Sequence, residues 1–387
     1  MMKVMLAFGT RPEAIKMCPL VNELKRRPGI ETVVCVSGQH RQMLDQVLTL
    51  FGVQADYDLG IMKDRQTLFD ITAGILESIR GVLEKERPDV VLVHGDTSTA
   101  FATALACFYL RIPVGHVEAG LRTYDMDSPF PEEFNREAVG IISRYHFAPT
   151  EAARQNLLRE GKSEESIFVT GNTAIDALKT TVREEYSHPE LTWAEGSRLV
   201  FLTAHRRENL GKPMRQMFRA IRRVMEEHPD VKALYPIHMS PAVRSAAEQE
   251  FGGLDRMHIC EPVDVFDCHN LMARSYLILT DSGGIQEEAP SLGKPVLVMR
   301  DTTERPEGVA AGTLKLVGTE EETIYREFTR LLDDRDAYEA MSRASNPYGD
   351  GRASERIADI LERIALSGDA SRRRADPSPE EWAEAWM

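Results

Sequence analysis

Three carboxylates in the first half of the chain stand where a buried strand ends or the next helix begins. Asp96 follows the apolar run Val90–Val93 after two residues, and Glu118 follows Val114–Val117 directly. Glu132 opens a later helical pattern. Each has a plain structural explanation, as a helix cap, as the partner of a nearby arginine, or as the partner of a helix dipole. Because a carboxylate at the end of a buried strand is costly unless it is paired or used, three at one sheet edge together favour a chemical role.

Imidazoles follow two apolar runs in the second half. Leu199–Thr203 leads through Ala204 into His205 and Arg206, and another run ends at His238. Ionisable groups directly after a buried strand are poor core material, so His205 is a candidate acid or base. A hydrogen-bonded structural histidine is the alternative at both positions.

A Ser-Gly-Gly turn is the most specific local feature. Ser282, Gly283 and Gly284 separate a predicted strand from a predicted helix, and glycines let a phosphate approach the N–H groups at the positive helix end. Glu288 is placed to accept hydrogen bonds from ribose hydroxyls, and Arg305 is a further anion contact. We favour a nucleotide diphosphate site over an ordinary glycine-rich turn.

A second candidate anion site lies near the start of the chain. Arg11 and Pro12 follow the run Val4–Phe8, and Lys16 comes one turn later. Proline suits the first position of a helix, and a helix N-terminus with two cations attracts anions. A helix start with two solvated cations is the equally weighted alternative.

For these residues to act together, the fold must bring the ends of several strands to one edge of a sheet. Short continuous apolar runs alternate with amphipathic segments such as Pro12–Arg27 and Thr97–Leu110. This alternation predicts an α/β fold with mostly parallel, doubly wound sheets, whose ligands lie at the carboxyl ends of the strands. The predicted strands are Val4–Phe8, Thr32–Val36, Val90–Val93, Val114–Val117, Ile167–Val169, Leu199–Thr203, Lys232–Pro236, His258–Cys260, Tyr276–Thr280 and Pro295–Met299.

A chain of 387 residues favours two domains. We expect an N-terminal Rossmann-like domain over residues 1–170 and a C-terminal one over residues 171–351, facing each other across a cleft. Residues 352–366 form a last amphipathic helix, and residues 367–387 form a flexible tail.

Composition and missing motifs exclude several classes of protein. A net charge of −14 disfavours a nucleic-acid binder, and no run is long enough to insert in a membrane. The N-terminus lacks a signal peptide, and the five cysteines show no paired spacing, so we expect a cytoplasmic protein with reduced thiols. No GxGxxG motif follows a strand and no HExxH or paired Cys/His spacing occurs, so we expect neither NAD nor metal as a cofactor.

Six motifs occur in an order that resembles the non-hydrolysing UDP-N-acetylglucosamine 2-epimerases. They are GTRPE with Lys16, HGDTST, HVEAGLRT, SPFPEEFNR, TAHRREN and DSGGIQEE, within residues 3–366. The resemblance implies a glycosyltransferase-B-like pair of domains, a homodimer, and a last helix that packs on the N-terminal domain.

The resemblance also implies roles for individual residues. The catalytic set matches Asp96, Glu118, Glu132 and His205. Contacts to UDP fall on Arg11, Lys16, His238, Ser282, Gly283, Gly284, Glu288 and Arg305. A second, allosteric UDP-N-acetylglucosamine site matches Gln39, Gln42, Arg65, Gln66, Arg206 and His238.

The implied reaction inverts carbon 2 of UDP-N-acetylglucosamine and gives UDP-N-acetylmannosamine. UDP is eliminated to leave 2-acetamidoglucal and is then added back. A hydrolysing epimerase that releases N-acetylmannosamine, a UDP-sugar glycosyltransferase and a nucleotide-sugar sensor are the alternatives. One departure concerns Cys268, where relatives often carry phenylalanine, so an aromatic contact near the uracil is in doubt.

Overall fold

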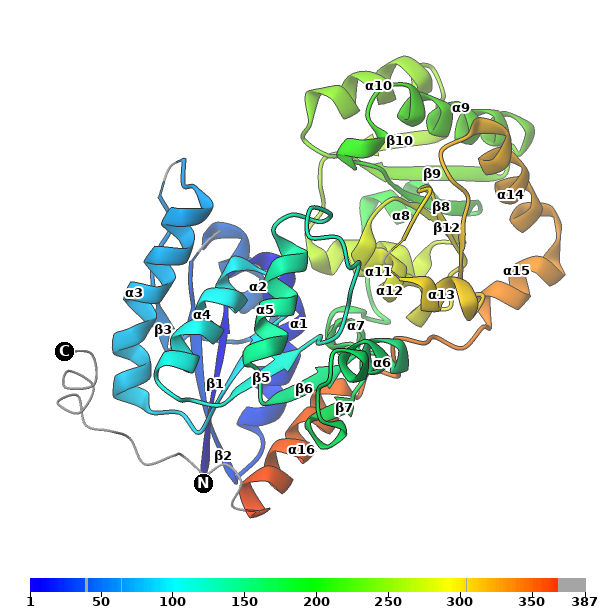
Figure 1. Ribbon diagram of the computed structural model, residues 1–387. Coiled ribbons are helices and arrows are strands. Elements are labelled where there is room, and N and C mark those ends of the chain that lie inside the picture. Colours follow the sequence, from blue (N-terminus) through cyan, green and yellow to red (C-terminus); the bar gives the residue numbers. More distant parts are fainter. Residues whose placement is uncertain (39–40, 64, 304, 368–387) are drawn as a thin grey trace, which may run out of the picture. The chain divides into compact units, whose positions relative to one another are not determined.

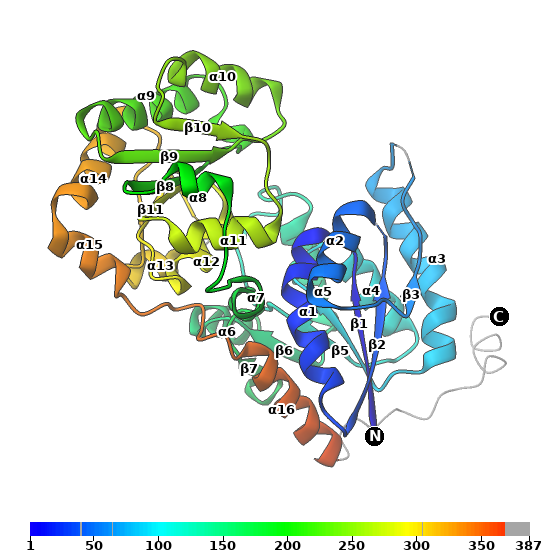
Figure 2. The same ribbon diagram turned by 180° about the vertical axis from the view of Figure 1, so that it is seen from behind.

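The computed structural model describes residues 1–38, 41–63, 65–303 and 305–367, without the side chains of residues 41–43. These residues form two compact units. Unit 1 comprises Met1–Thr173 and the segment from Arg352 onward, and unit 2 comprises Ala174–Gly351. Each unit is a parallel sheet flanked by helices (Figures 1 and 2).

The sheet of unit 1 has, within the described residues, seven strands in the order β3-β2-β1-β4-β5-β6-β7, and all neighbours are parallel. The order changes direction between β1 and β4, and parallel sheets bind ligands outside such a switch point. The strands are β1 (Met2–Phe8), β2 (Ile30–Val36), β3 (Tyr57–Asp58), β4 (Val90–His94), β5 (Val114–Val117), β6 (Tyr145–Ala148) and β7 (Ile167–Val169).

Helices cover this sheet and close its core. On one face, Ile75 and Ile79 pack with Met5 and Val91 of the central strands, all fully buried. The last helix lies against the first helix, where Arg27 pairs with Glu362 at 3.1 Å. The helices are α1 (Arg11–Lys25), α2 (Arg41–Phe51), α3 (Leu68–Glu86), α4 (Ser98–Tyr109), α5 (Glu132–Ile142), α6 (Glu151–Arg159), η1 (Glu164–Ser166) and α16 (Ala353–Ser367); α7 (Thr173–Thr181) begins at the boundary between the units.

Unit 2 repeats the arrangement, with six strands among its described residues in the order β10-β9-β8-β11-β12-β13, all parallel. Its switch point lies between β8 and β11. The strands are β8 (Arg198–Thr203), β9 (Val231–Pro236), β10 (Met257–Cys260), β11 (Leu277–Thr280), β12 (Val296–Val298) and β13 (Leu314–Leu316). The helices are α8 (Pro189–Trp193), η2 (Arg207–Asn209), α9 (Lys212–Glu227), α10 (Pro241–Phe251), α11 (Val265–Arg274), α12 (Gly283–Ser291), α13 (Pro306–Ala310), α14 (Glu321–Asp333) and α15 (Arg335–Ser342).

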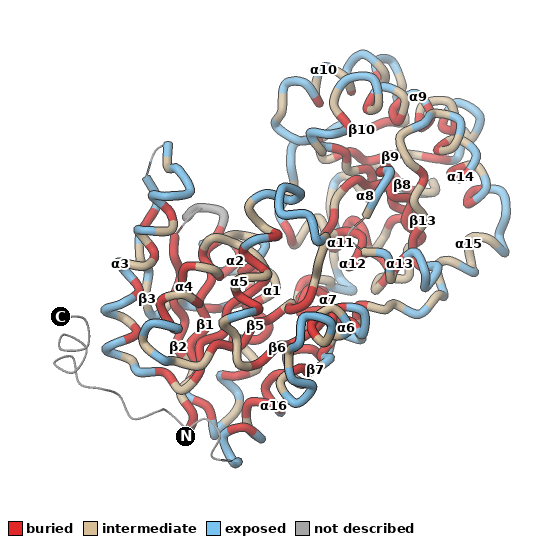
Figure 3. Tube along the Cα trace, viewed as in Figure 1, coloured by how far each residue is buried: buried red, intermediate tan, exposed pale blue. Residues whose placement is uncertain are grey.

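The predicted doubly wound α/β class is confirmed. The central strands of both sheets are buried, as their continuous apolar sequences require (Figure 3). The ten predicted strands are all present, and β3, β6 and β13 were missed. The cysteines are free thiols, and no helix in the described part of the chain is long and apolar enough to cross a membrane. The predicted tail lies, apart from Ser367, outside the described residues.

Candidate functional site

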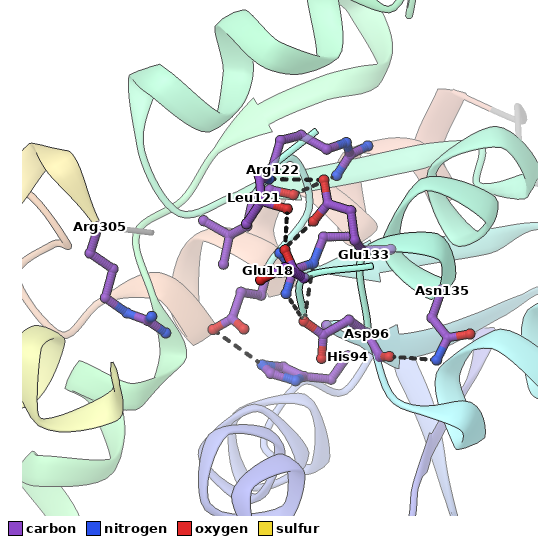
Figure 4. A network of polar contacts seen from close by, with 12 residues as sticks. His94, Asp96, Glu118, Leu121, Arg122, Glu133, Asn135 and Arg305 are labelled. Carbon is purple, nitrogen blue, oxygen red and sulfur yellow. Dashed lines mark hydrogen bonds and ion pairs between the residues drawn. The ribbon is translucent and has the colours of Figure 1, made fainter. Parts of the chain in front are cut away.

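Glu118 directly follows β5 at the carboxyl edge of the unit 1 sheet. Its side chain is only 9% exposed and forms an ion pair with Lys16 of α1. Asn172 Nδ2 donates a 3.0 Å hydrogen bond to the same oxygen, Oε2, and His94 Nε2 lies 3.7 Å from it (Figure 4). Burial lowers the pKa of His94 to about 4, so this imidazole is neutral at pH 7. Glu118 is therefore a carboxylate oriented by two side-chain donors, Lys16 and Asn172.

Asp96 lies two residues beyond β4 and is held from helix α5. Arg136 donates to Asp96 Oδ2 through Nε at 3.1 Å and also through Nη2. Asn135 Nδ2 fixes the backbone by donating to the Asp96 carbonyl oxygen at 2.9 Å. The Asp96 side chain remains 26% exposed, so it is oriented and also accessible to a ligand.

Glu133, rather than its neighbour Glu132, is the buried carboxylate of α5. Its side chain is fully buried and accepts hydrogen bonds from Arg136 Nη1 at 2.9 Å and from the backbone N–H groups of Thr123 and Tyr124 at 2.8 Å each. Glu132 is half-buried at the first position of the helix, and its carboxylate makes no hydrogen bond or ion pair with any described residue. Sequence reasoning named neither Glu133 nor Arg136 as part of the site, although their i, i+3 spacing on a helix is a pairing signal.

Arg122, which the sequence offered as a structural partner of Glu118, is used elsewhere. Its guanidinium pairs with both carboxylate oxygens of Glu160, at 2.7 and 2.8 Å, and donates to the Leu121 carbonyl oxygen. The structural explanation considered for Glu118 was wrong in its partner, because Lys16 takes that place.

The switch point of unit 2 carries His205 on a fixed backbone. Asp281 is fully buried and accepts hydrogen bonds from the N–H groups of His205 and Arg206, both at 2.9 Å to Oδ2, and from Asn209 Nδ2 at 3.1 Å. The His205 side chain is 40% exposed, lies with Nδ1 3.4 Å from Asp281 Oδ1, and stacks on exposed His238 with ring centroids 5.5 Å apart. Loss of solvent lowers the pKa of His205, whereas the Asp281 carboxylate raises it.

The predicted Ser-Gly-Gly turn is the start of α12. Ser282 is the N-cap, but its side chain makes no capping hydrogen bond to the helix, and its own N–H donates to Thr280 Oγ1 at 2.9 Å. Gly283 and Gly284 therefore open the helix without a side chain covering the N–H groups of its first turn. Such a helix start can bind an anion.

Two further predicted contacts of UDP are already oriented by neighbours. Glu288 Oε2 lies 3.4 Å from Nε2 of buried His269. Arg305 donates from Nε to buried Glu287 at 2.6 Å. In unit 1, Arg11 is half-buried at the first position of α1.

The six residues of the predicted allosteric site belong to both units. Gln39 lies outside the described residues, and Gln42 belongs to α2, where its side chain is also not described. Arg65 is exposed with a left-handed backbone (φ 57°), and Gln66 donates to the Ile61 carbonyl oxygen. Arg206 donates from Nε to the Asp281 carbonyl oxygen at 3.1 Å, which ties it to the same residue as His205.

Cys268, the departure noted above, is half-buried on α11. Phe266, two residues earlier, packs edge-on against Tyr186 with ring centroids 5.6 Å apart. Within the described part of the chain, no group of three or more His, Cys, Asp or Glu side chains is arranged to hold a metal ion.

Comparison with known proteins places the whole chain in one group. Residues 22–362 match the family model for UDP-N-acetylglucosamine 2-epimerase. The UDP-N-acetylglucosamine 2-epimerase of Bacillus subtilis is 61% identical over 360 residues, which cover 93% of this chain and 95% of that protein. The protein of the same name from Escherichia coli K12 is 52% identical, over 95% of this chain and 100% of its own.

A solved relative gives the same result for the fold. The crystal structure of UDP-GlcNAc 2-epimerase from Neisseria meningitidis, bound to UDP-GlcNAc, has a TM-score of 0.86 and 48% identity, and the match covers 94% of this chain and 100% of that chain. The two doubly wound units are thus the glycosyltransferase-B-like fold that we expected.

Proposed function

The chain belongs to the UDP-N-acetylglucosamine 2-epimerase family, and from this we propose that it interconverts UDP-N-acetylglucosamine and UDP-N-acetylmannosamine. The observation that carries the proposal is the pair of oriented carboxylates, Asp96 and Glu118, after neighbouring strands β4 and β5. A reaction that removes a proton from one face of carbon 2 and returns one to the other face needs two such groups.

We propose elimination and re-addition as the route. A carboxylate removes the proton of carbon 2, the electrons of that bond form the double bond between carbons 1 and 2, and the bond from carbon 1 to the phosphate oxygen breaks with its electron pair leaving on UDP. The product is 2-acetamidoglucal. Re-addition returns UDP to carbon 1 while a second carboxyl protonates carbon 2 on the opposite face.

The contacts support a division of these tasks. Lys16 and Asn172 orient Glu118, and Arg136 orients Asp96, so each carboxylate is held in place to act on one face of carbon 2. Glu132 completes the proposed set. His205, kept on a rigid loop by Asp281, is proposed to assist departure of the diphosphate.

Binding of UDP is assigned mainly to unit 2. The uncapped start of α12 at Ser282, Gly283 and Gly284 accounts for the diphosphate, with Arg305 and His238 as further contacts. Glu288 is proposed to bind the ribose hydroxyls. Arg11 and Lys16 of unit 1 remain in the proposed set, and Lys16 has the additional partner Glu118.

One incubation with UDP-N-acetylglucosamine alone separates the candidates. We expect UDP-N-acetylmannosamine as the product, which anion-exchange chromatography and proton NMR would detect. Free N-acetylmannosamine with UDP would instead identify a hydrolysing enzyme, and no product would indicate a transferase or a sensor. In heavy water, the product should carry deuterium at carbon 2, and full retention of the original hydrogen would contradict proton exchange through accessible carboxyls.

The proposed carboxylates are tested with nearly isosteric variants. Asp96→Asn, Glu118→Gln and Glu132→Gln should each lower kcat by at least about a hundredfold, the lower range for acid–base groups. Glu137→Gln on the same helix α5 is the matched control, because Glu137 has no hydrogen bond or ion pair with a described residue. Three variants with rates near that of the wild type would refute the assignment.

We also propose that UDP-N-acetylglucosamine is an allosteric activator. Arg206 follows His205 and shares its anchor Asp281, so a ligand on Arg206 would act on the loop of His205. Given UDP-N-acetylmannosamine alone, the reverse reaction should be slow and should speed up with a trace of UDP-N-acetylglucosamine, and Gln42→Ala should abolish the activation. Hyperbolic kinetics with a fast unassisted reverse reaction would remove this proposal and leave the epimerase standing.

A homodimer is the last part of the proposal. Large apolar side chains are exposed on three neighbouring helices of unit 1: Phe69 on α3, Phe108 and Tyr109 on α4, and Phe134 and Ile141 on α5. Such a face favours burial against a second copy. Light scattering should give twice the chain mass, and Phe108→Asp should halve it. Leu366→Asp, on an exposed leucine of α16, should not. A monomeric wild type at micromolar concentration would overturn the proposal.

The cytoplasmic location stays a prediction.

A further inference from the structure

Glu133 is a buried carboxylate for which the proposed reaction has no direct use. It is fully buried, and all three of its hydrogen-bond donors are named above: Arg136 Nη1 and the N–H groups of Thr123 and Tyr124. A buried charge is retained only when it is compensated, and removal of its partner is strongly destabilising. Glu133 therefore requires Arg136 in this position.

Arg136 is shared between two carboxylates. Its Nη1 serves Glu133, whereas its Nε and Nη2 serve Asp96, and its side chain is only 9% exposed. Glu133 and Arg136 lie one turn apart on α5, so a rigid helix sets the spacing. The guanidinium is thus fixed on one side by Glu133 and presented to Asp96 on the other.

The other cation at this sheet edge already has a partner of its own. Lys16 of α1 pairs with Glu118 after β5, and His94 at the end of β4 is neutral at pH 7. Glu132, which precedes Glu133 on the same helix, adds a further carboxylate. Asp96 and Glu133 consequently divide the one positive charge of Arg136.

We propose that Glu133 is a positioning residue, which fixes Arg136 and, by sharing its charge, keeps Asp96 able to exchange a proton during turnover. This inference rests on the proposed epimerase function. Without the charge of Glu133, the whole charge of Arg136 would act on Asp96 and would disfavour the acid form that must later protonate carbon 2. Glu133 also ties the segment at Thr123 and Tyr124 to the start of α5, just before Glu132.

The pH dependence of kcat/KM tests the inference. In Glu133→Gln, the amide oxygen can keep the two backbone hydrogen bonds, whereas Arg136 keeps its two contacts with Asp96. The two carboxylates flank one guanidinium, so loss of the negative charge of Glu133 should move the acidic limb down by about half a pH unit, because a like charge disfavours the ionised form of its neighbour. A purely structural role would lower activity without moving this limb.

Controls separate the possible outcomes. Glu137→Gln removes the same charge from the same helix and should leave the limb in place. If Glu133→Gln does not fold, Glu133→Asp carries the test: the charge stays, so the limb stays, while the shorter side chain misplaces Arg136 and lowers kcat by about tenfold to a hundredfold. An unmoved limb in folded Glu133→Gln, an equal shift in Glu137→Gln, or a wild-type kcat in Glu133→Asp would overturn the inference. A wild type that makes no UDP-N-acetylmannosamine would instead refute the proposed function, before any variant is compared.

Discussion

Replacement of Asp281 by asparagine should loosen the loop that carries His205. The Asp281 carboxylate is fully buried, and among the described residues it accepts hydrogen bonds from the N–H groups of His205 and Arg206 and from the amide of Asn209. Asparagine keeps the shape but puts an NH₂ group in place of one oxygen. That group then faces donors and cannot accept from them.

The lost hydrogen bonds set the size of the effect. A hydrogen bond to a charged group contributes about 1.5 to 3 kcal/mol, and a buried donor left unsatisfied costs about 1 to 3 kcal/mol more, so the total loss is about 2.5 to 6 kcal/mol. In a domain of the size of unit 2, each kcal/mol lowers Tm by about 2 to 4 °C. We therefore expect the unfolding of unit 2 to begin about 5 to 24 °C lower.

Thermal unfolding at pH 7.5, with hydrogen exchange to locate the affected peptides, measures this loss. Exchange should rise in β8, β11 and the loop after β8 and stay unchanged in unit 1. Asp264→Asn is the matched control, because Asp264 caps α11 at an exposed position where asparagine is an equally good cap. NMR should also show a lower pKa for His205, since the Asp281 carboxylate raises it in the wild type. Equal melting of both variants would refute the reasoning.

Three further predictions follow from buried groups. Burial lowers the pKa of His94 and His146 to about 4 and that of His116 to about 3. Because the unfolded state then takes up protons before the folded state does, Tm should fall as the pH drops from about 6.5 to about 4. A constant Tm over that range would contradict this prediction. Gly120→Ala should destabilise unit 1, because φ is 90° there and an added Cβ would lie 2.3 Å from the Ala153 carbonyl oxygen. Urea unfolding would measure the loss of stability. The control is Gly81→Ala, at a helical site where no atom lies within 4 Å of the added Cβ. Arg122→Met removes the hydrogen bonds to Glu160 and should lower the free energy of unfolding by about 2 to 4 kcal/mol in the same assay. The control is Arg80→Met at an exposed ion pair, and a smaller loss of stability in Arg122→Met than in this control would refute the prediction.

Most of the strands that sequence reasoning found contain a continuous apolar run, such as Val90–Val93, and such a run is a strong signal for a buried strand. The three missed strands lack such a run. Tyr57–Asp58 has two residues at a sheet edge, Tyr145–Ala148 contains a histidine, and Leu314–Leu316 is interrupted by Lys315. Their strand conformation comes from pairing with a neighbour, which local sequence does not encode.

The residues of the site also fall into those that sequence reasoning could predict and those that it could not. Asp96, Glu118 and His205 could be found because they follow buried strands within two residues, and the parallel fold then places each at the edge of its sheet. Their partners could not, because pairing depends on which helix lies over which strand end. Lys16 reaches Glu118 across 102 positions of the chain, and Arg136 reaches Asp96 across 40. A sequence gives no distance between such residues until the fold is known.

The two switch points hold their carboxylates in different ways, and the difference matches their proposed tasks. Asp281 has backbone N–H groups among its donors, is fully buried and supports the loop of His205. Glu118 and Asp96 are held by the side chains of Lys16, Asn172 and Arg136 and keep part of their surface accessible. Side-chain donors can adjust when a carboxylate gains a proton, whereas a backbone cradle cannot. A sheet edge whose carboxylates are held by side chains can therefore carry proton transfer. A sheet edge whose carboxylate is held by backbone N–H groups is suited to keep an imidazole and a phosphate site in place.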